Sequence, residues 1–409
     1  MFMESIMINM MKNKKVLWVN PSFLDYRIPL YKELNSICNG CFYLIYSRRR
    51  IPARCDEAIK KTLGDNAISV TENRLFLKRK TDFANSGISL TWPHGLYRAI
   101  KEVNPDIILT EGYSQFSPWP ILYATIHRIP VVIAYERTKH TERNCPLWRR
   151  LYRRFINVFT NGYIANGRLT KEYLMSQGVK EKNIFTGGMC ADSKGLARQV
   201  ANLSEDDLSA FRKQILNGKS CGVSYVLVGR MIPLKGVFHL LEGFIEHLKA
   251  HPDDRIVLVG DGPELPDLKE KYGNNPAVVF VGGIDYSQIY KYYAACDVFV
   301  IATLEDNWSL VVPEAMACGL PVACSIYNGC HPELVHKDEN GITFDPLDPK
   351  SVVEALDYFH HVDIKRFGQR SREIEHNFNP ENTAKNVMKA VEYYLNKQDA
   401  KTTDNEDRQ

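Results

Sequence analysis

The sequence predicts an α/β protein with two Rossmann-like domains, each built on a doubly wound parallel sheet. Short runs of Val, Ile and Leu alternate with longer amphipathic stretches, which is the pattern of βαβ units that form a parallel sheet. The chain has 409 residues, 44% of them hydrophobic, which is enough for two domains of ordinary size with separate cores. We therefore expect one parallel sheet in each half of the chain.

The apolar runs place the predicted strands. In the first half they fall at residues 16–20, 42–46, 107–110, 131–135 and 163–165. In the second half the runs are clearer, at residues 224–229, 255–260, 278–282, 298–302, 321–324 and 341–344. The strand pattern is interrupted between Met189 and Tyr225, where an acidic helix start at Ser204 intervenes. We expect an N-terminal domain over residues 1–200 and a second domain over residues 201–378.

Both chain ends differ in composition from the rest. Residues 1–11 precede the first predicted core strand and are expected to be a loose tail, to which the sequence assigns no role. Residues 397–409 are polar and are expected to be disordered. No apolar run reaches the roughly 18 residues that a bilayer span requires.

Charge and cysteine content limit the possible partners and compartments. The net charge of +4 is too small to call for a nucleic acid partner. The 10 cysteines are scattered and no secretory signal is visible, so free thiols in a cytoplasmic protein are expected. Cys38 and Cys41 have the spacing of a zinc or redox pair, but no second pair accompanies them, and two ordinary thiols are the expected state.

Two positive residues follow the first strand of the second half. Gly229-Arg230 ends this strand, and Lys235-Gly236 comes after four further residues. Arginine offers a planar fork for two phosphate oxygens, whereas lysine acts as a compact charge, so the two are complementary beside a pyrophosphate. Glycine at 229 and 236 allows close backbone approach, and the helix that begins near Val237 would direct its N-terminal N–H groups at an anion.

A second segment joins a polar loop, a short helix and a buried strand around acidic side chains. It runs Glu305-Asp-Asn-Trp-Ser-Leu-Val-Val-Pro-Glu314 and continues as Ala-Met-Ala-Cys-Gly-Leu-Pro-Val322. A carboxylate accepts two hydroxyl donors at once, which suits a sugar diol. Together with the cations at 230 and 235, this segment predicts a nucleotide-sugar site.

In their order and spacing these segments resemble the donor half of the retaining, family 4 glycosyltransferases, also called glycosyl transferases group 1, which have the GT-B fold. The family pattern is Gly-Arg, Lys-Gly, Gly-Asp-Gly-Pro and then two acids with seven residues between them. Here the turn is Gly260-Asp-Gly-Pro263 and the acids are Asp306 and Glu314. The first acid is an aspartate rather than a glutamate, and Trp308-Ser309 replaces the usual aromatic-Gly pair.

The resemblance implies an architecture and a reaction. The two Rossmann-like domains would face an interdomain cleft, and the last helix, about residues 379–396, would cross back to the first domain. The enzyme would retain the anomeric configuration without an enzyme nucleophile, the leaving phosphate taking the acceptor proton while Arg230 and Lys235 hold it. No cofactor is expected, and no metal, since the Asp-x-Asp segment of metal-dependent sugar transferases is not found.

The resemblance also assigns the remaining donor residues. Glu314 would bind the ribose of the nucleotide, and Asp306 would face the transferred sugar. The rest of the donor set comprises the glycines of the strand ends and the loop after Asp306, namely Gly229, Gly236, Gly262, Gly282, Asn307, Trp308 and Ser309.

The acceptor side belongs to the first domain. Ser22 and Arg27 follow the first strand, at the carboxyl edge of its sheet, where ligands of such sheets bind. After the strand at 131–135 the family often has a histidine near the reacting carbon, and this chain has Glu136 instead. Glu136 and His140 are therefore candidates for acceptor orientation or proton transfer, although a single histidine is more often structural.

Arginines interleave with aromatic residues between Trp148 and Phe155, and a further cluster spans Arg48 to Arg50. Such a helix either contacts an anionic membrane or presents a solvated basic face. Membrane contact at the inner face would give access to a sugar or lipid-linked sugar acceptor, as in cell-surface polysaccharide or glycolipid assembly.

Two other functions stay open at the sequence level. A nucleotide-sugar epimerase on the same fold would act on the donor alone, without an acceptor. A catalytically silent nucleotide-sugar-binding subunit is suggested by Glu136 and Asp306, which stand where the family usually has other residues.

Overall fold

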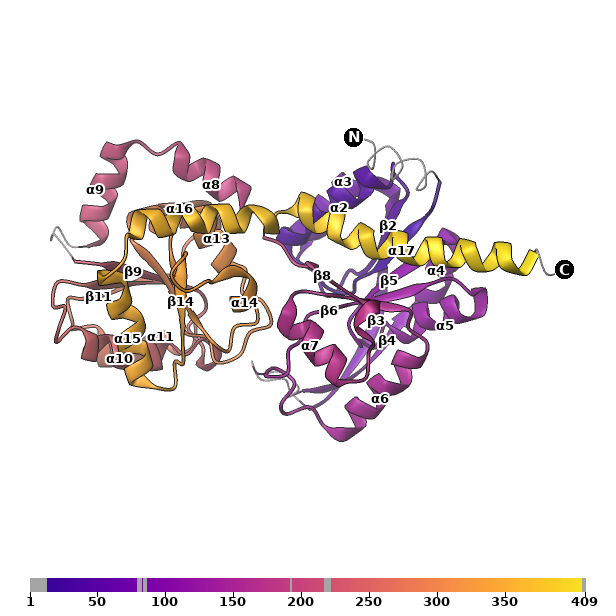
Figure 1. Ribbon diagram of the computed structural model, residues 1–409, viewed down its shortest axis with the longest axis horizontal. Coiled ribbons are helices and arrows are strands. Elements are labelled where there is room, and N and C mark those ends of the chain that lie inside the picture. The colour runs from indigo at the N-terminus through magenta and orange to yellow at the C-terminus, as the bar shows by residue number, and fades with distance from the viewer. Residues whose placement is uncertain (1–12, 79–82, 84–86, 192, 217–221, 407–409) are drawn as a thin grey trace. The chain divides into compact units, whose positions relative to one another are not determined.

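The computed structural model describes residues 13–78, 83, 87–191, 193–216 and 222–406, and its chain divides into two compact units (Figure 1). Unit 1 comprises residues 1–190 and 380–409, and unit 2 comprises residues 191–379. The change from unit 1 to unit 2 was expected ten residues later, at 200/201. The structure places 191–200 in unit 2, where α8 (Lys194–Ala201) packs on α12 (Ile289–Ala295) and α13 (Val311–Ala317).

Unit 1 is built on an eight-stranded sheet in the order β4-β3-β2-β1-β5-β6-β7-β8. All neighbours are parallel except β3 and β4, which form an antiparallel hairpin at one edge. The strands are β1 (Val16–Val19), β2 (Phe42–Ser47), β3 (Ala67–Lys78), β4 (Ile88–His94), β5 (Ile107–Glu111), β6 (Val131–Tyr135), β7 (Gly162–Ala165) and β8 (Ile184–Thr186).

Helices cover both faces of this sheet, as a sheet with apolar residues on each face requires. One face packs against α2 (Ile28–Ile37), α3 (Ala53–Leu63) and α17 (Pro380–Glu406). The other packs against α4 (Leu96–Val103), α5 (Pro118–His127), α6 (Leu147–Val158) and α7 (Arg168–Ser176). The final helix, α17, therefore belongs to the core of unit 1, together with strands and helices from the first half of the chain.

Unit 2 is built on a six-stranded parallel sheet in the order β11-β10-β9-β12-β13-β14. The strands are β9 (Ser224–Val228), β10 (Arg255–Val259), β11 (Val278–Gly282), β12 (Val298–Ile301), β13 (Val322–Ser325) and β14 (Gly341–Phe344). The β9, β10 and β12 strands are almost wholly buried runs of Val, Ile, Leu and Phe, as expected of central strands covered on both faces.

Three α-helices of unit 2 begin at a side-chain cap. The Ser204 hydroxyl accepts a hydrogen bond from the Asp207 N–H at the start of α9 (Glu205–Ile215). The Asp348 carboxylate accepts the Lys350 N–H at the start of α15 (Pro349–Asp357), and the Asp363 carboxylate accepts the Arg366 N–H at the start of α16 (Ile364–Glu375). The core on one face includes side chains of α10 (Val237–His247), α11 (Leu265–Tyr272) and α15 (Pro349–Asp357). The remaining α-helices are α9 (Glu205–Ile215), α14 (His331–Leu334) and α16 (Ile364–Glu375).

All eleven predicted strands are present, with ends that shift by at most one residue. Three strands were not predicted, namely β3, β4 and β8. The hairpin strands were missed because polar and charged residues interrupt both of them, and β8 is only three residues long.

The expected disordered tail at 397–409 is wrong for residues 397–406, which continue α17. The helix was expected to stop near Asn396, but Gln398 donates a hydrogen bond to the Arg128 carbonyl at 3.3 Å and so anchors the next turn. The expected loose segment at residues 1–11 lies outside the described residues.

The described cysteines are free thiols, as predicted. Cys38 is buried, and its sulfur lies 3.9 Å from the sulfur of Met388 in the core. Among the described helices, none is both long enough and apolar enough to cross a membrane.

Candidate functional site

The strand order of unit 2 locates its ligand site. From β9 the chain first winds through β10 to β11 on one side and then returns to β12 on the other, so the sheet has a topological switch point between β9 and β12. Ligands of such sheets bind at the carboxyl ends of the strands beside this point. The loops that follow β9 and β12 carry Arg230, Lys235 and Asp306, three of the residues that the sequence predicts for the donor site.

The loop after β9 turns sharply before α10. Gly236 has φ +62° and stands at the N-terminus of α10, and a Cβ there would lie 2.2 Å from the carbonyl oxygen of Ala302. Only glycine fits both the backbone conformation and this contact. The turn brings the Lys235 side chain next to the loop after β12, whereas the Arg230 side chain is exposed.

Lys235 and Asp306 form an ion pair across the switch point, with Nζ 2.8 Å from Oδ2. The same Oδ2 accepts a hydrogen bond from the Ser309 hydroxyl at 2.5 Å, and Oδ1 accepts one from the Trp308 N–H at 3.1 Å. Burial alone would raise the pKa of the Asp306 carboxyl, but the Lys235 ammonium and these hydrogen bonds hold that pKa below its ordinary value.

These contacts bear on the expected role of Asp306. This residue was expected, with the backbone of Ser309, to face the transferred sugar. In the structure both carboxylate oxygens of Asp306 accept hydrogen bonds from this chain's own donors, one of which is the Ser309 hydroxyl. Asp306 therefore orders the loop and positions Lys235. The Trp308 ring is buried 5.9 Å from the Phe378 ring, and its indole N–H has no hydrogen-bond partner among the described residues. Asn307 follows Asp306 and is partly exposed.

Glu314 lies in the first turn of α13, which follows this loop in the chain, and is buried. Its two carboxylate oxygens accept hydrogen bonds from the hydroxyls of Tyr286, at 3.0 Å, and Tyr293, at 3.2 Å. Burial and the charge of Glu314 raise the pKa of Tyr293 well above its ordinary value, so this phenol stays a donor. Sequence reasoning missed both tyrosines, because they come from a different βα unit and no local motif marks them.

The loops after β9 and β10 pack directly against each other. The Met231 N–H donates to the Asp261 carbonyl at 2.9 Å, and a Cβ on Gly262 would lie 2.3 Å from the Met231 carbonyl oxygen. Gly282, at the end of β11, has φ +85° and open space where a Cβ would stand. Of these two predicted donor glycines, Gly262 is needed for close packing and Gly282 for its backbone conformation.

Unit 1 has a corresponding switch point between β1 and β5. For Arg27 the sequence left two roles open, contact with an acceptor or a phosphate and a plain surface position near a helix start. Arg27 is buried and pairs with Glu111 at 3.3 Å, so the surface position is wrong. Burial raises the pKa of Glu111 above its ordinary value; Arg27 opposes the rise and the charge of Glu136 adds to it. Glu111 was not predicted, although it directly follows a predicted strand at the carboxyl edge of the sheet.

Beside this pair lies a cavity of about 630 Å³, within unit 1. It is bordered by Glu111, Glu136 and Arg137 from the strand ends, by Trp148 and Arg149 from α6, and by residues of β4. Glu136 thus stands where a ligand could reach it. Among the described residues that border the cavity, His140 and Ser22 do not appear. The Ser22 hydroxyl donates to the Arg50 carbonyl at 3.2 Å.

A family model described as glycosyl transferases group 1 matches residues 223–361, which hold the Lys235 and Asp306 pair and Glu314. This segment is a glycosyl transferases group 1 domain. The predicted family is thereby confirmed for this segment, and the group 1 domain occupies the sheet of unit 2 and most of its helices.

The chain is also similar to curated proteins over parts of its length. Sulfoquinovosyl transferase SQD2 of Arabidopsis thaliana is 32% identical over 277 residues, which cover 66% of this chain and 52% of SQD2. Alpha-monoglucosyldiacylglycerol synthase of Acholeplasma laidlawii is 30% identical over 122 residues, which cover 29% of this chain and 30% of the synthase. The chain thus spans about half or less of the length of these curated relatives.

The likeness to solved structures extends over both units. HepE of Anabaena, solved in complex with UDP and glucose, matches with a TM-score of 0.67 at 16% identity, over 93% of this chain and 100% of the HepE chain. At this identity the match concerns the fold. The group 1 domain and unit 1 together have the GT-B fold, as predicted.

Proposed function

We propose that this chain transfers a sugar from a nucleotide-sugar donor to a hydroxyl acceptor with retention at the anomeric carbon, without a metal ion, in cell-surface polysaccharide or glycolipid assembly. The observation that carries the proposal is the paired Lys235 and Asp306 at the switch point of the group 1 domain, with Glu314 close by in α13. The bound UDP named for the HepE structure is consistent with a nucleotide at such a sheet.

The donor diphosphate would bind at the N-terminus of α10, between Arg230 and Lys235. The Lys235 ammonium lies 2.8 Å from Asp306, so its charge is already ordered before a ligand arrives. A phosphate that enters beside it shares or replaces the carboxylate as partner, and both cations stabilise the negative charge that grows as the bond to the sugar breaks. Backbone N–H groups of the first turn of α10 add to this stabilisation.

Glu314 would bind the ribose diol. Its oxygens hold two tyrosine hydroxyls, and the Tyr286 ring, unlike the Tyr293 ring, is largely exposed. A ribose hydroxyl could therefore take the place of the Tyr286 phenol while Tyr293 keeps the other oxygen in position.

The acceptor would occupy the cavity of unit 1. Glu111 and Glu136 both border it, and the charge of Glu136 adds to the rise of the Glu111 pKa. A carboxylate oxygen can accept a hydrogen bond from an acceptor hydroxyl. The leaving phosphate would take the proton of this hydroxyl, and Glu136 would orient it.

Membrane contact through α6 would bring a lipid-linked acceptor to this cavity. Leu147, Leu151, Phe155 and Val158 lie along one face of α6 and are each more than half exposed. Arginines flank this face, and Arg149 donates a hydrogen bond to the Gly87 carbonyl, just before the β4 strand with its exposed Leu90 and Trp92. An apolar stripe edged by arginines is typical of helices that lie on anionic membranes. The Acholeplasma relative is named for a lipid product.

The test is transfer of a labelled sugar from a panel of nucleotide-sugars to lipid and oligosaccharide acceptors, with the anomeric configuration of the product read by NMR. We expect a retained linkage, and a loss of turnover of at least 100-fold in the Arg230→Ala Lys235→Ala double variant, because each cation acts on the charge of the transition state. Lys249→Ala, an exposed lysine beyond α10, is the control. Turnover that survives the double variant would contradict these roles.

The same assay separates the other two functions. An epimerase would convert the donor with no acceptor present, and a silent subunit would bind nucleotide without turnover on any acceptor. The Arabidopsis and Acholeplasma relatives are named as a transferase and a synthase, which favours transfer.

A further inference from the structure

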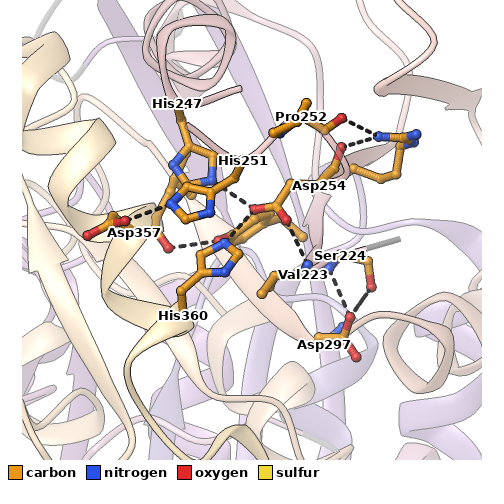
Figure 2. A network of polar contacts seen from close by, with 12 residues as sticks. Val223, Ser224, His247, His251, Pro252, Asp254, Asp297, Asp357 and His360 are labelled. Carbon is orange, nitrogen blue, oxygen red and sulfur yellow. Dashed lines mark hydrogen bonds and ion pairs between the residues drawn. The ribbon is translucent and has the colours of Figure 1, made fainter. Parts of the chain in front are cut away.

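Three histidines gather in unit 2 (Figure 2), at the end of α10 that lies away from Lys235. His247 is the last residue of α10, His251 follows one turn later, and His360 ends the short 3₁₀ helix after α15. The helix α10 begins next to Lys235, and its 11 residues span roughly 16 Å at 1.5 Å per residue. The cluster is therefore separate from the proposed donor site, and a role for these histidines does not depend on sugar transfer.

The three imidazoles lie close together. One ring nitrogen from each lies within 4.8 Å of the corresponding nitrogens of the other two. The rings of His251 and His360 are stacked with centroids 3.7 Å apart, and the His247 ring lies 4.7 Å from the His251 ring. The His247 side chain is fully buried, whereas those of His251 and His360 are 22% and 20% exposed. A solute ion can thus approach from the side of the latter two.

A buried carboxylate stands among the three rings. Oδ2 of Asp254 is 2.8 Å from Nε2 of His247 and 2.8 Å from Nε2 of His360. Its other oxygen accepts the Val223 N–H at 2.8 Å, which fixes the carboxylate at the start of β9. Burial alone would raise the pKa of Asp254, but the hydrogen bonds from the two histidines and from Val223 hold that pKa below its ordinary value. The cluster thus offers three imidazoles and one anionic oxygen.

A second carboxylate orients the third ring. Asp357 Oδ1 is 2.8 Å from His251 Nε2. On a neutral ring this bond places the proton on Nε2 and leaves Nδ1 of His251 as the lone-pair nitrogen. A carboxylate that holds one nitrogen of a histidine while the other binds a metal is a common arrangement in metal sites.

The hydrogen bonds within the cluster leave one ring nitrogen unsatisfied. Nδ1 of His247 is buried and has no hydrogen-bond partner among the described residues. The described partner of this ring is therefore the Asp254 carboxylate, through Nε2.

We propose that His247, His251, His360 and Asp254 bind a zinc ion. Three nitrogens and one carboxylate oxygen form a tetrahedral set that zinc accepts, once the ion has replaced the protons that bridge Oδ2 of Asp254 to Nε2 of His247 and of His360. Ligand atoms of a tetrahedral zinc ion at about 2.0–2.1 Å lie about 3.4 Å apart, so the ring nitrogens need to approach one another by little more than 1 Å. The stacked rings of His251 and His360 must also turn out of their parallel arrangement, so that their in-plane lone pairs converge on the ion. The ion would tie the end of α10 to the segment after α15 and would stabilise unit 2 rather than take part in a reaction.

The test is metal binding to the full-length chain freed of any histidine tag. Zinc content after dialysis, the visible spectrum of the cobalt-substituted protein and the shift of the thermal midpoint with zinc are measured on wild type, His251→Asn, His360→Asn and His361→Asn. The first two variants change partly exposed ligands, and their folding is checked by circular dichroism in EDTA. His361 is the matched control, since its Nε2 contacts Asp357 at 3.2 Å and it lies outside the triad.

We expect wild type and His361→Asn to bind one zinc ion, to give the intense absorption of tetrahedral cobalt and to melt at a higher temperature with zinc. In His251→Asn and His360→Asn the affinity should fall at least tenfold, the loss that even outer contacts of a metal site produce. Wild type that keeps no zinc and shows no cobalt spectrum would overturn the proposal. So would zinc binding of equal strength in all four proteins.

Discussion

At the residue scale, the group 1 domain keeps its key lysine in a defined place. The Lys235 ammonium would otherwise sample many positions on its flexible stem, and Asp306 restricts it to one. Asp306 is in turn held by Ser309 and Trp308. An aspartate at this position can therefore act through the lysine, which is a role that the family pattern alone did not suggest.

Replacement of Asp306 by Asn should weaken the fold of unit 2 and change its response to acid. At neutral pH we expect a loss of about 1.5–3 kcal/mol, the range for hydrogen bonds to charged groups. Because the folded-state pKa of Asp306 is lowered, its stabilisation is present above the ordinary aspartate pKa of about 3.9 and disappears as the pH falls through the lower folded value.

Thermal midpoints measured from pH 7 down to pH 3 check this prediction. The difference between wild type and Asp306→Asn should shrink in the most acid samples. Asp253→Asn, at an exposed position, should follow wild type throughout. A difference that stays constant down to pH 3 would show that the charge of Asp306 is not what matters.

Residue-level prediction from the sequence succeeded where a motif is local. Gly229 through Gly236 lie in one loop, so spacing alone placed Lys235 at the helix start. The partners of Glu314 could not be found this way, because Tyr286 and Tyr293 come from a neighbouring βα unit. Glu111 was within reach, since it directly follows a predicted strand, but its pairing with Arg27 depends on the crossover that makes β1 and β5 neighbours.

At the element scale, parallel strands were readily predicted because they are buried on both faces and appear as unbroken apolar runs. The β3 and β4 hairpin lacks this signal. Leu75, Phe76 and Leu77 of β3 are consecutive and all exposed, so apolar and polar residues do not alternate regularly in this strand. The antiparallel edge of the sheet in unit 1 therefore came only from the structure.

The exposed face of α6 should be needed for membrane binding and not for folding. We expect Leu151→Glu Phe155→Glu to reduce co-sedimentation with vesicles containing anionic lipid at least tenfold, since each buried apolar side chain contributes about 1.5–3 kcal/mol. Both residues are more than half exposed, so the thermal midpoint should hardly change. The control is Leu347→Glu, an equally exposed leucine of unit 2.

Two results would contradict membrane docking through α6. One is wild-type protein whose co-sedimentation with vesicles does not increase when the vesicles contain anionic lipid. The other is a double variant that binds vesicles as wild type does.

At the scale of the whole molecule, the two units are not two contiguous halves of the chain. The last helix, α17, adds Val387, Met388, Val391, Tyr394 and Leu395 to the core of unit 1. This return was expected from family resemblance and not from composition, because the helix pattern does not reveal which sheet the helix covers. Thr383 and Met189 are in contact within unit 1, with the threonine hydroxyl 3.4 Å from the methionine carbonyl.

A fragment of residues 1–190 should therefore fail to fold. The missing apolar side chains of α17 are worth on the order of 10 kcal/mol at about 1.5–3 kcal/mol each, which is comparable to the whole stability of a domain. Joining residue 190 to residues 380–409 by a short Gly-Ser linker should restore a cooperative thermal transition, whereas a linker to a scrambled α17 should not. A fragment 1–190 that melts cooperatively by itself would refute this view of unit 1.

The central claim is that the group 1 domain binds a nucleotide-sugar through Lys235, and its most direct test is thermal stabilisation by UDP, GDP, ADP, TDP, CMP and their sugars. A ligand that binds the folded state raises the midpoint according to its concentration relative to its dissociation constant. We predict a selective shift with one base in wild type and in Lys249→Ala, and its loss in Lys235→Ala. An equal shift in Lys235→Ala, or none with any nucleotide in wild type, would contradict the claim.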